Sequence, residues 1–451
     1  MITTKIDNKK ELEIARQALD MVHKHGAQAG RISLNIGIQN SFSVLEEKLD
    51  RLQSANDRSL YIQIFVNGRY GAYSTNRLEN RELSSFIKQA IEATKLLAPD
   101  TCRTLPSKEL CYFGEGGDLE QFDPYILTMN PADKKAFAFE AAAEIYGSNK
   151  KLVSVSSEYG DVLDYQYMVD SQGFEGDSLQ SSFTISVECS VKGRGDARPD
   201  GWWYECEMLY KNFSPKGCGK EALKRALGKL NPKKIESARM PMVVDRNCSS
   251  RLISPIISAL SGSNIQQKNS FLIDSLGKKL FSDKMTFIDT PHQYGMTGSR
   301  YFDGDGLSTR PLTIIDKGVV NTYFINTYSA NKMGIAPTIE GPSVPGFSLE
   351  DFPKEYRELT GEKMIPLIGR GIFVTGFNGG NCNIGTGDFS YGIEGFYFEN
   401  GKILFPIKEM NITGNIIPLW TNLVFAGNDA RHCTRWQIPA LAFDSVDFTG
   451  L

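Results

Sequence analysis

Hydrophobic and polar residues alternate near the end of the chain, in the stretch Phe389–Phe398. One face of this stretch carries Phe389, Tyr391, Ile393, Gly395 and Tyr397. A period of two is typical of a β-strand. Asn400-Gly401 follows and favours the type I′ turn of a hairpin, which predicts a second strand at Ile403–Ile407. Gly and Asn residues at 378–381 and 385–388 predict turns before the first strand.

The beginning of the chain shows a helical period instead. Leu12, Ala15, Leu19 and Val22 fall on one side of a predicted helix over Lys9–His25. Strands are then predicted at Arg31–Asn40, Tyr61–Val66 and Tyr70–Ser74, and a second helix at Arg81–Leu97. Together these elements predict a compact α+β unit. Residues 98–132 are rich in Pro and Gly, which indicates a connector on the surface.

The same patterns extend the prediction to the rest of the chain. Helices are predicted over Pro131–Tyr146, Lys220–Leu230, Ser249–Ser261, Ser329–Met333 and Ser348–Arg357, and strands at Lys151–Tyr159, Leu163–Asp170, Phe174–Lys192, Gly201–Glu205 and Met240–Val244. A chain of 451 residues exceeds one ordinary core, so two units are expected. We expect an α+β fold, with an N-terminal α+β domain over residues 1–235 and a mainly antiparallel β domain over residues 236–451.

Composition and charge exclude several classes of protein. A net charge of −3 argues against a dominant nucleic-acid surface, which needs a basic excess. The chain has no signal-peptide pattern and no apolar run long enough to span a membrane, so we expect a cytoplasmic protein without membrane contact. Its eight cysteines include no CxxC pair, which favours free thiols over a disulfide framework or a zinc knuckle.

Two blocks of sequence resemble the TldD/TldE (PmbA) metallopeptidase family. The block TGDFSYGIEGFYFENG, with a later GN and GND, contributes Gly387, Asp388, Gly395, Asn400, Gly401, Gly414, Asn415 and Asn428. The block FDGDG, which leads through DKGV to TYSA, contributes Asp303, Gly304, Gly306 and Tyr328. The resemblance covers most of the chain. It implies a TldD/PmbA-like fold in which these residues have structural roles.

The resemblance also shows where the chemistry of the family should lie. In TldD-type members, a short helix carries HExxxH, whose histidines hold zinc while the glutamate acts as a base. The corresponding positions here are Ile253 and Ser258 for the histidines and Ser254 for the glutamate, with Pro255 inside the motif. Neither Ile nor Ser replaces an imidazole. We therefore expect neither a catalytic residue nor a metal ligand nor a cofactor in this chain.

The four histidines offer no replacement for this motif. His23 and His25 lie two apart near a predicted helix end and point in different directions, as expected for surface residues. His292 lies in a loop without a Cys or acidic neighbour. His432 and Cys433 are adjacent, but a nucleophilic Cys requires a His across a cleft and an oxyanion hole.

Other candidate residues are no stronger. Asp303, Asp305 and Asp316 lack the ligand spacing of a calcium-binding loop. The glycines at 378–387 do not open a helix with Lys-Ser/Thr, so a phosphate site is not predicted. Cys382 gives no better case for a nucleophile than Cys433.

The resemblance implies a TldE/PmbA-like subunit without metal. Its expected partner is a TldD-like zinc peptidase that acts on small or unfolded peptides, as in peptide-precursor maturation and antitoxin degradation in the family. This chain would then wall the chamber and offer strand edges to an extended peptide. A homodimer is expected when the partner is absent. Whether this chain is itself an enzyme stays open. Alternatives are an independent hydrolase with an unrecognised site and a binding protein that modulates DNA gyrase. The Pro- and Gly-rich segment 337–353 is either a lid or disordered.

Overall fold

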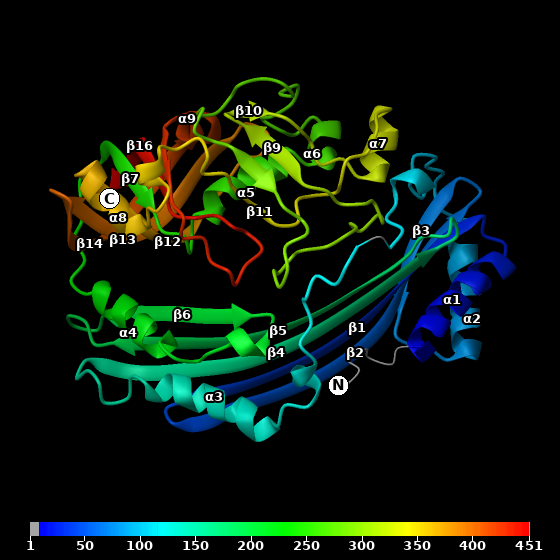
Figure 1. The fold of residues 1–451 in the computed structure, drawn as a ribbon, viewed down its shortest axis with the longest axis horizontal. Coiled ribbons are helices and arrows are strands. Elements are labelled where there is room, and N and C mark those ends of the chain that lie inside the picture. The colour runs from blue at the N-terminus through cyan, green and yellow to red at the C-terminus, as the bar shows by residue number, and fades with distance from the viewer. Residues whose placement is uncertain (1–8, 115, 451) are drawn as a thin grey trace.

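The computed structural model describes residues 9–114 and 116–450, except the side chains of Lys9 and Glu11. The described chain has an α+β fold, as predicted (Figure 1). Its strands form two six-stranded sheets and one four-stranded sheet among the described residues.

The first sheet is antiparallel and unusually long. Its strands are β1 (Ala29–Leu45), β2 (Lys48–Val66), β3 (Arg69–Thr75), β4 (Leu152–Asp170), β5 (Glu175–Val191) and β6 (Asp200–Glu207). They lie in the order β3-β2-β1-β4-β5-β6. Hairpins join neighbours in sequence, while β1 and β4 pair over their full shared length, from Arg31 opposite Asp170 to Leu45 opposite Ser156.

Four helices cover the apolar face of this sheet: α1 (Lys9–Lys24), α2 (Asn80–Thr94), α3 (Pro131–Ala143) and α4 (Cys218–Gly228). Helices α1 and α2 pack on one half of the face, against Ile32 and Leu34 of β1. Helices α3 and α4 pack on the other half, against Phe42 and Val44 of the same strand. Because residues two apart share a face, one continuous strand supports both clusters.

The opposite face of the first sheet is polar. In β4, for example, Asp164 and Gln166 alternate with the buried Leu163, Tyr165 and Tyr167 and are exposed. The C-terminal half lies on this polar side in Figure 1. The two halves meet where Met168 of β4 and Phe174 of the β4–β5 turn pack against Phe302.

The C-terminal half contains the other two sheets. The small sheet has the order β10-β9-β8-β11, with β8 (Phe287–Asp289), β9 (Leu312–Asp316), β10 (Val319–Val320) and β11 (Pro345–Phe347). The larger sheet has the order β14-β13-β12-β7-β16-β15, with β7 (Ala238–Val244), β12 (Gly371–Cys382), β13 (Asp388–Glu399), β14 (Lys402–Asn415), β15 (Leu423–Ala426) and β16 (Leu441–Gly450). Pairing of β14 with β16 closes this sheet on itself.

Five helices accompany these sheets: α5 (Ser250–Ala259), α6 (Gly262–Gln266), α7 (Thr327–Met333), α8 (Gly361–Ile368) and α9 (Ile416–Thr421). Short 3-10 turns lie at Lys108–Leu110, Pro124–Leu127, Tyr210–Asn212 and Lys354–Tyr356. The core of this half is built around Trp420, which is fully buried and donates from Nε1 to the Leu252 carbonyl over 3.2 Å. This contact ties α9 to α5.

Several predicted elements differ from the structure. The predicted strands Lys151–Tyr159 and Leu163–Asp170 are one strand, β4, because Gly160 stays in register opposite Ser41. Residues 378–381 form no turn and lie within β12, where bulges and two positive-φ glycines replace it. The predicted helix Ser348–Arg357 is wrong, since only Lys354–Tyr356 forms a 3-10 turn after Pro353.

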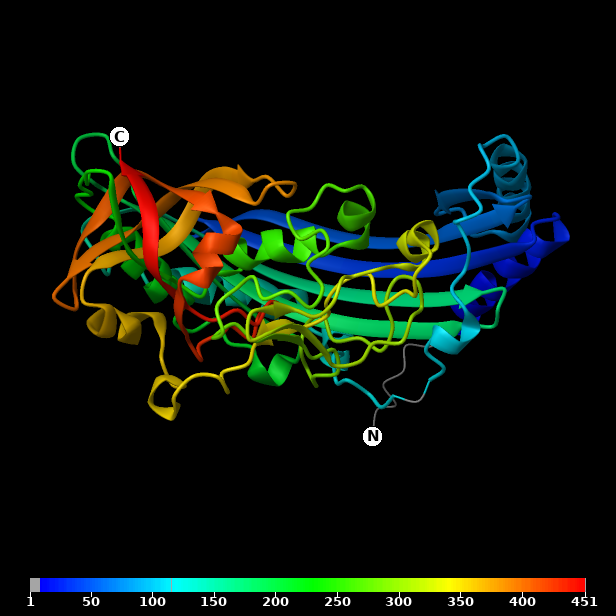
Figure 2. The same cartoon turned by 90° about the horizontal axis from the view of Figure 1, so that it is seen from above.

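The segment 337–353 is a packed part of the structure and no lid. Its strand β11 pairs with β8, and Val344, Ile339 and Phe352 are buried. Within the described ranges, no helix combines the length and apolar character needed to cross a membrane. Figure 2 shows how the C-terminal half runs along the first sheet when seen from above.

Candidate functional site

The position predicted for the zinc motif falls on α5, which follows β7 through a tight turn. Asp245 closes this turn, because its carbonyl accepts N–H groups from Cys248 and Ser249 at 3.0 Å each. Its carboxylate accepts the N–H of Asn247 at 2.8 Å. A hydrogen-bonded turn thus connects β7 directly to α5.

The motif positions occupy different environments on α5. Ile253 is fully buried in the core of the C-terminal half. Ser254 is exposed, and Ser258 is half-buried. Pro255 is tolerated inside the helix and is buried. None of the three motif positions supplies an imidazole or a carboxylate.

A cavity of about 470 Å³ opens at the start of α5. Its walls come from the β7–α5 turn, the exposed side of α5, β12 and the C-terminal loop: Asn247, Cys248, Ser250, Arg251, Ser254, Phe377 and Trp436. Ser254, at the glutamate position of the family motif, therefore lines a cavity. The position is predicted from the sequence, whereas the cavity around it forms only when distant segments pack together.

Arg251 is the charged group of this cavity. Its Nη2 donates to the Gly380 carbonyl over 2.7 Å, and its guanidinium carbon lies 5.0 Å from the ring centre of Tyr391. No acidic side chain in the described part of the chain forms an ion pair with it. The cavity therefore has a positive charge that is fixed in place by uncharged partners.

Cys248 also lines this cavity but is poorly suited to act as a nucleophile. Its thiol contacts the Asp245 carbonyl at 3.4 Å. Burial, with Asp245 nearby, raises the pKa of the Cys248 thiol well above its ordinary value. A thiol that stays protonated is a weak nucleophile. No histidine lines this cavity.

The donors in this region do not fit zinc. Zinc sites use three or four Cys, His, Asp or Glu side chains around one point. Across residues 9–114 and 116–450, no three such side chains are grouped so that they could hold a metal ion. The cavity at α5 offers hydroxyls, a guanidinium and one protonated thiol.

A second cavity, of about 400 Å³, brings a cysteine and a histidine into one place. Cys206, Glu207 and His432 are among its lining residues, together with Glu120, Lys211 and Tyr294. Burial raises the pKa values of the Cys206 thiol and the Glu207 carboxyl, and His432 opposes the shift of Glu207. Within the described residues, no hydrogen bond joins Cys206 to His432. The arrangement lacks the activated thiolate of a cysteine hydrolase.

Arg431 lies between the two cavities and was not identified from the sequence. Its Nη1 donates to Asn247 Oδ1 at 2.9 Å, and its Nη2 lies 3.0 Å from Glu205 Oε2 on β6. Its guanidinium carbon lies 4.1 Å from the ring centre of Trp203, and the side chain is only 7% exposed. It therefore links the turn before α5 to the edge of the first sheet. A lone Arg after a Gly-Asn-Asp turn gives no sequence signal for such a link.

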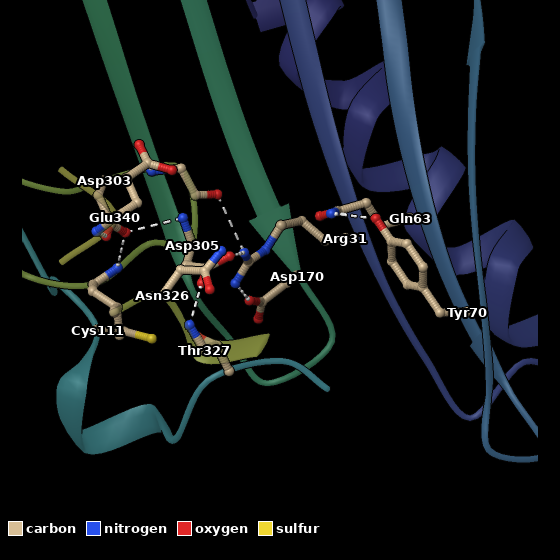
Figure 3. Close-up of polar contacts among 12 residues, drawn as sticks. Arg31, Gln63, Tyr70, Cys111, Asp170, Asp303, Asp305, Asn326, Thr327 and Glu340 are labelled. Atoms are coloured by element: carbon tan, nitrogen blue, oxygen red, sulfur yellow. Dashed lines mark hydrogen bonds and ion pairs between the residues drawn. The ribbon is translucent and has the colours of Figure 1, made fainter. Parts of the chain in front are cut away.

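The FDGDG block forms a polar junction between the two halves (Figure 3). Asp303 is buried and accepts N–H groups from Asp305 at 2.9 Å, Leu307 at 3.0 Å and Glu340 at 2.9 Å. Asp305 accepts the N–H of Thr327 at 2.8 Å and faces Arg31 from β1. Burial, reinforced by Glu340, raises the pKa of Asp303 to about 6. This cluster organises turns and holds no cation site.

The glycines and the tyrosine of this block lie close to other segments of the chain. A Cβ on Gly304 would meet Glu340 Oε2 at 2.7 Å, and Gly306 has φ +81°. Tyr328 donates to Asp100 at 2.8 Å, which connects α7 to the segment after α2. Asp316 ends β9 and is exposed.

The residues of the C-terminal block lie in turns, at a helix cap and within strands. Gly387 has φ +81°, and Asn400 and Gly401 form the β13–β14 turn with φ +51° and +71°. Asn415 caps α9 and donates to Asp388 Oδ1 at 2.9 Å. The remaining three are Gly395 and Gly414, inside β13 and β14, and Asn428, whose N–H donates to the Leu359 carbonyl at 2.8 Å.

The other candidate side chains lie apart from the cavity at α5. His25 contacts Ser84 Oγ at 3.0 Å, and His23 is exposed on α1. His292 contacts Thr309 Oγ1 at 3.0 Å, and burial lowers its pKa. Burial also raises the pKa of Cys382 to about 11, which does not favour a thiolate there. Of the candidate side chains, Ser254 thus lines the cavity at α5 and His432 lines the second cavity.

Comparisons with known proteins give a consistent result. Three family models match in order: PmbA/TldA metallopeptidase domain 1 at residues 31–94, the central domain at 124–230 and the C-terminal domain at 237–450. A metalloprotease PmbA homolog from Haemophilus influenzae is 26% identical over 96% of this chain and 94% of its own.

Solved structures show the same relation. A protein from Bacteroides thetaiotaomicron, named as a modulator of DNA gyrase, is 44% identical, with full coverage of both chains and a TM-score of 0.94. TldE from Thermococcus kodakarensis shares the fold, with 18% identity, a TM-score of 0.81 and coverage of 97% of this chain and 100% of its own.

Proposed function

This chain belongs to the PmbA/TldA metallopeptidase family, and we propose that it is a TldE/PmbA-like subunit without metal, paired with a TldD-like zinc peptidase. In this proposal the partner supplies zinc and the hydrolytic step in a cytoplasmic complex. This chain contributes binding surface for small or unfolded peptides and stabilises the catalytic subunit. It has no catalytic residue of its own.

The placement of α5 carries the proposal. The residues at the histidine and glutamate positions are Ile253, Ser258 and Ser254, and Ile253 is fully buried among apolar side chains. Zinc binding here would require more than one substitution and a different orientation of the helix. The fold is that of the family, while the donors at its catalytic position are of the wrong chemical type.

The edge of β12 supports a role in peptide binding. Along Gly376–Cys382, β12 pairs with β13 on one side, while its pairing with β7 ends at Val374. Among the described residues, no strand pairs with the other side of this segment, and Phe377 from the same segment lines the cavity at α5. An extended peptide binds such an edge through its main chain.

Reconstitution with a partner tests the proposal. The isolated chain, purified without chelator, should contain no stoichiometric zinc and should not cleave casein-derived peptides. Mixing it with a TldD-like zinc peptidase should produce cleavage well above that of either chain alone. A partner variant with the motif glutamate changed to Gln is the matched control, and its mixture should be inactive. Stoichiometric zinc on the isolated chain, or chelator-sensitive cleavage by it, would refute the proposal.

The oligomeric state gives an independent measurement. We expect the isolated chain to form a homodimer that exchanges for the heterodimer when the partner is added. Light scattering coupled to size-exclusion chromatography distinguishes the two species by mass. A monomer that never associates with a TldD-like chain contradicts the proposed assembly.

A role with DNA gyrase is a second candidate, favoured by the name of the Bacteroides thetaiotaomicron relative. A DNA-binding surface would make the affinity fall steeply with salt. The net charge of −3 does not favour such a surface. Titration of labelled duplex DNA at two salt concentrations tests it directly, since binding without salt dependence excludes a phosphate-reading surface.

A further inference from the structure

We infer that the cavity at the start of α5 binds a carboxylate of a peptide through Arg251. The inference rests on the proposed function only in taking the ligand to be a peptide. The site itself is defined by side chains of this chain. It lies at the position predicted for the zinc motif of zinc-bearing relatives.

The guanidinium of Arg251 is held but not neutralised. One of its five N–H groups donates to the Gly380 carbonyl at 2.7 Å, and its guanidinium carbon lies 5.0 Å from the ring centre of Tyr391. These two contacts fix the side chain at a position that faces the cavity. Because neither contact is anionic, a charged donor group stays available for a ligand.

The surroundings of Arg251 favour an anion. The hydroxyls of Ser250 and Ser254 line the same cavity and have no hydrogen-bond partner within the described residues. The carboxylate of Asp245 accepts two bonds from Asn247 and forms no ion pair with Arg251. Arg246, in the same turn, donates to the Asp429 carbonyl at 3.0 Å and also has no acidic partner among described side chains.

The shape of the cavity indicates which anion. Phe377 and Trp436 form apolar walls beside the polar group, and a volume of about 470 Å³ is sufficient for one or two amino-acid residues. A carboxylate matches the planar fork of Arg by accepting two parallel bonds. A peptide that follows the free edge of β12 would bring an apolar side chain to these walls and a carboxylate to Arg251.

The small side chain of Ser254 keeps the guanidinium of Arg251 available. Ser254 lies three residues after Arg251 on α5, so the two side chains are neighbours on the helix. A glutamate at 254 would pair with Arg251 and neutralise it. The small hydroxyl of Ser254 leaves the charge of Arg251 available to a ligand.

Three acetylated pentapeptides test the site and identify the source of the carboxylate. Each consists of four Ala and a C-terminal Phe: one is the free acid, one the amide, and one the amide with Glu replacing the fourth Ala. Binding to the full chain is measured by isothermal titration calorimetry. At least one carboxylate-bearing peptide should bind about 10-fold or more tightly than the neutral amide. The free acid and the Glu peptide distinguish a chain terminus from a side chain.

Variants assign the effect to Arg251. Arg251→Gln and Ser254→Glu should each reduce binding of the carboxylate peptide to the level of the amide. Arg198→Gln is the charge-matched control, because Arg198 is an exposed loop side chain that donates to the backbone carbonyls of Gly195 and Ala197. Its affinity should equal that of the wild type. Circular dichroism should show that all three variants are folded.

Equal binding of acid and amide peptides, no binding of any peptide, or unchanged binding by Arg251→Gln would overturn the inference. These measurements use the isolated chain without zinc or partner. A failed reconstitution with a TldD-like peptidase would therefore refute the proposed function and leave the Arg251 site standing. If reconstitution succeeds but no peptide binds, the Arg251 site is refuted and the proposed function stands.

Discussion

Arg31 Nη2 lies 2.9 Å from Asp170 Oδ2, and the two side chains are only 2% and 1% exposed. The pair joins the first residues of β1 to the last residue of β4. Arg31 also faces Asp305, whose nearest oxygen is 4.0 Å away, so the pair lies at the contact between the two halves. This contact thus contains buried charge.

Replacing Arg31 with Met should reduce the free energy of unfolding by about 3–5 kcal/mol, because Asp170 would stay buried without its cation. Urea denaturation followed by circular dichroism measures the change. Arg16→Met is the control, since Arg16 pairs with Glu175 at an exposed position (48% and 47% exposed) and should cost about 0–1 kcal/mol. Equal effects of the two substitutions would contradict this account.

Replacing Arg431 with Gln should loosen the second contact between the halves. The substitution removes an ion pair with Glu205 and a cation–π contact with Trp203, which together stabilise by about 2–4 kcal/mol. Urea denaturation and limited proteolysis of the 427–437 loop measure it. Arg370→Gln is the control, because it removes an exposed ion pair with Glu399 and a cation–π contact with Tyr397. It should change the free energy of unfolding by about 1 kcal/mol or less.

The sequence predicted helices α1, α2, α4 and α5 well because their buried stripes are regular. Leu12, Ala15, Leu19 and Val22 do lie on the inner side of α1. The first part of β2 was missed because residues 48–58 are exposed on both faces of a hairpin. Such a segment is held by backbone bonds to β1 and leaves no alternation to detect.

Glycines form turns at some positions and allow close strand packing at others. Residues 378–381 contain the same amino acids as a turn, but Gly380 passes so close to β13 that a side chain would collide with the Ser390 carbonyl.

The candidate site could be predicted only in part from the sequence. Ser254 was predicted from the family resemblance. Arg251 and Trp436 line one cavity only because distant segments pack together, and Arg431 reaches Asn247 in the same way.

Replacing Gly395 with Ala should destabilise the C-terminal sheet. An added Cβ would lie 2.2 Å from the Phe373 carbonyl oxygen, so β12 and β13 would have to separate. We expect a loss of about 1–3 kcal/mol in the free energy of unfolding, measured by urea denaturation. Gly341→Ala is the matched control, because a Cβ there would meet nothing within 4 Å. A neutral Gly395→Ala would show that the strands adjust freely.

Asp303 should make stability depend on pH. Burial raises its pKa to about 6 in the folded chain, from an ordinary value of 3.8, so the folded state holds the proton more tightly. Its contribution to the free energy of unfolding therefore rises by up to about 3 kcal/mol as pH falls from about 6 to about 4. Above about pH 7 this contribution is constant. The difference in unfolding free energy between wild type and Asp303→Asn should follow this curve. A difference that stays constant between pH 7 and pH 4 would contradict this account.

Cys206 and His432 share a cavity, so they offer the strongest test of independent hydrolysis by this chain. Because burial raises the pKa of the Cys206 thiol and no described hydrogen bond joins it to His432, a reactive thiolate is not expected. Cys206→Ser and His432→Gln should therefore leave peptide cleavage by the reconstituted complex within about two-fold of wild type, less than the 10²–10⁴-fold contribution of a catalytic acid or base. Iodoacetamide labelling followed by mass spectrometry should modify Cys206 slowly at pH 7. Rapid labelling, together with cleavage by the isolated chain that Cys206→Ser abolishes, would instead establish a cysteine nucleophile in this cavity.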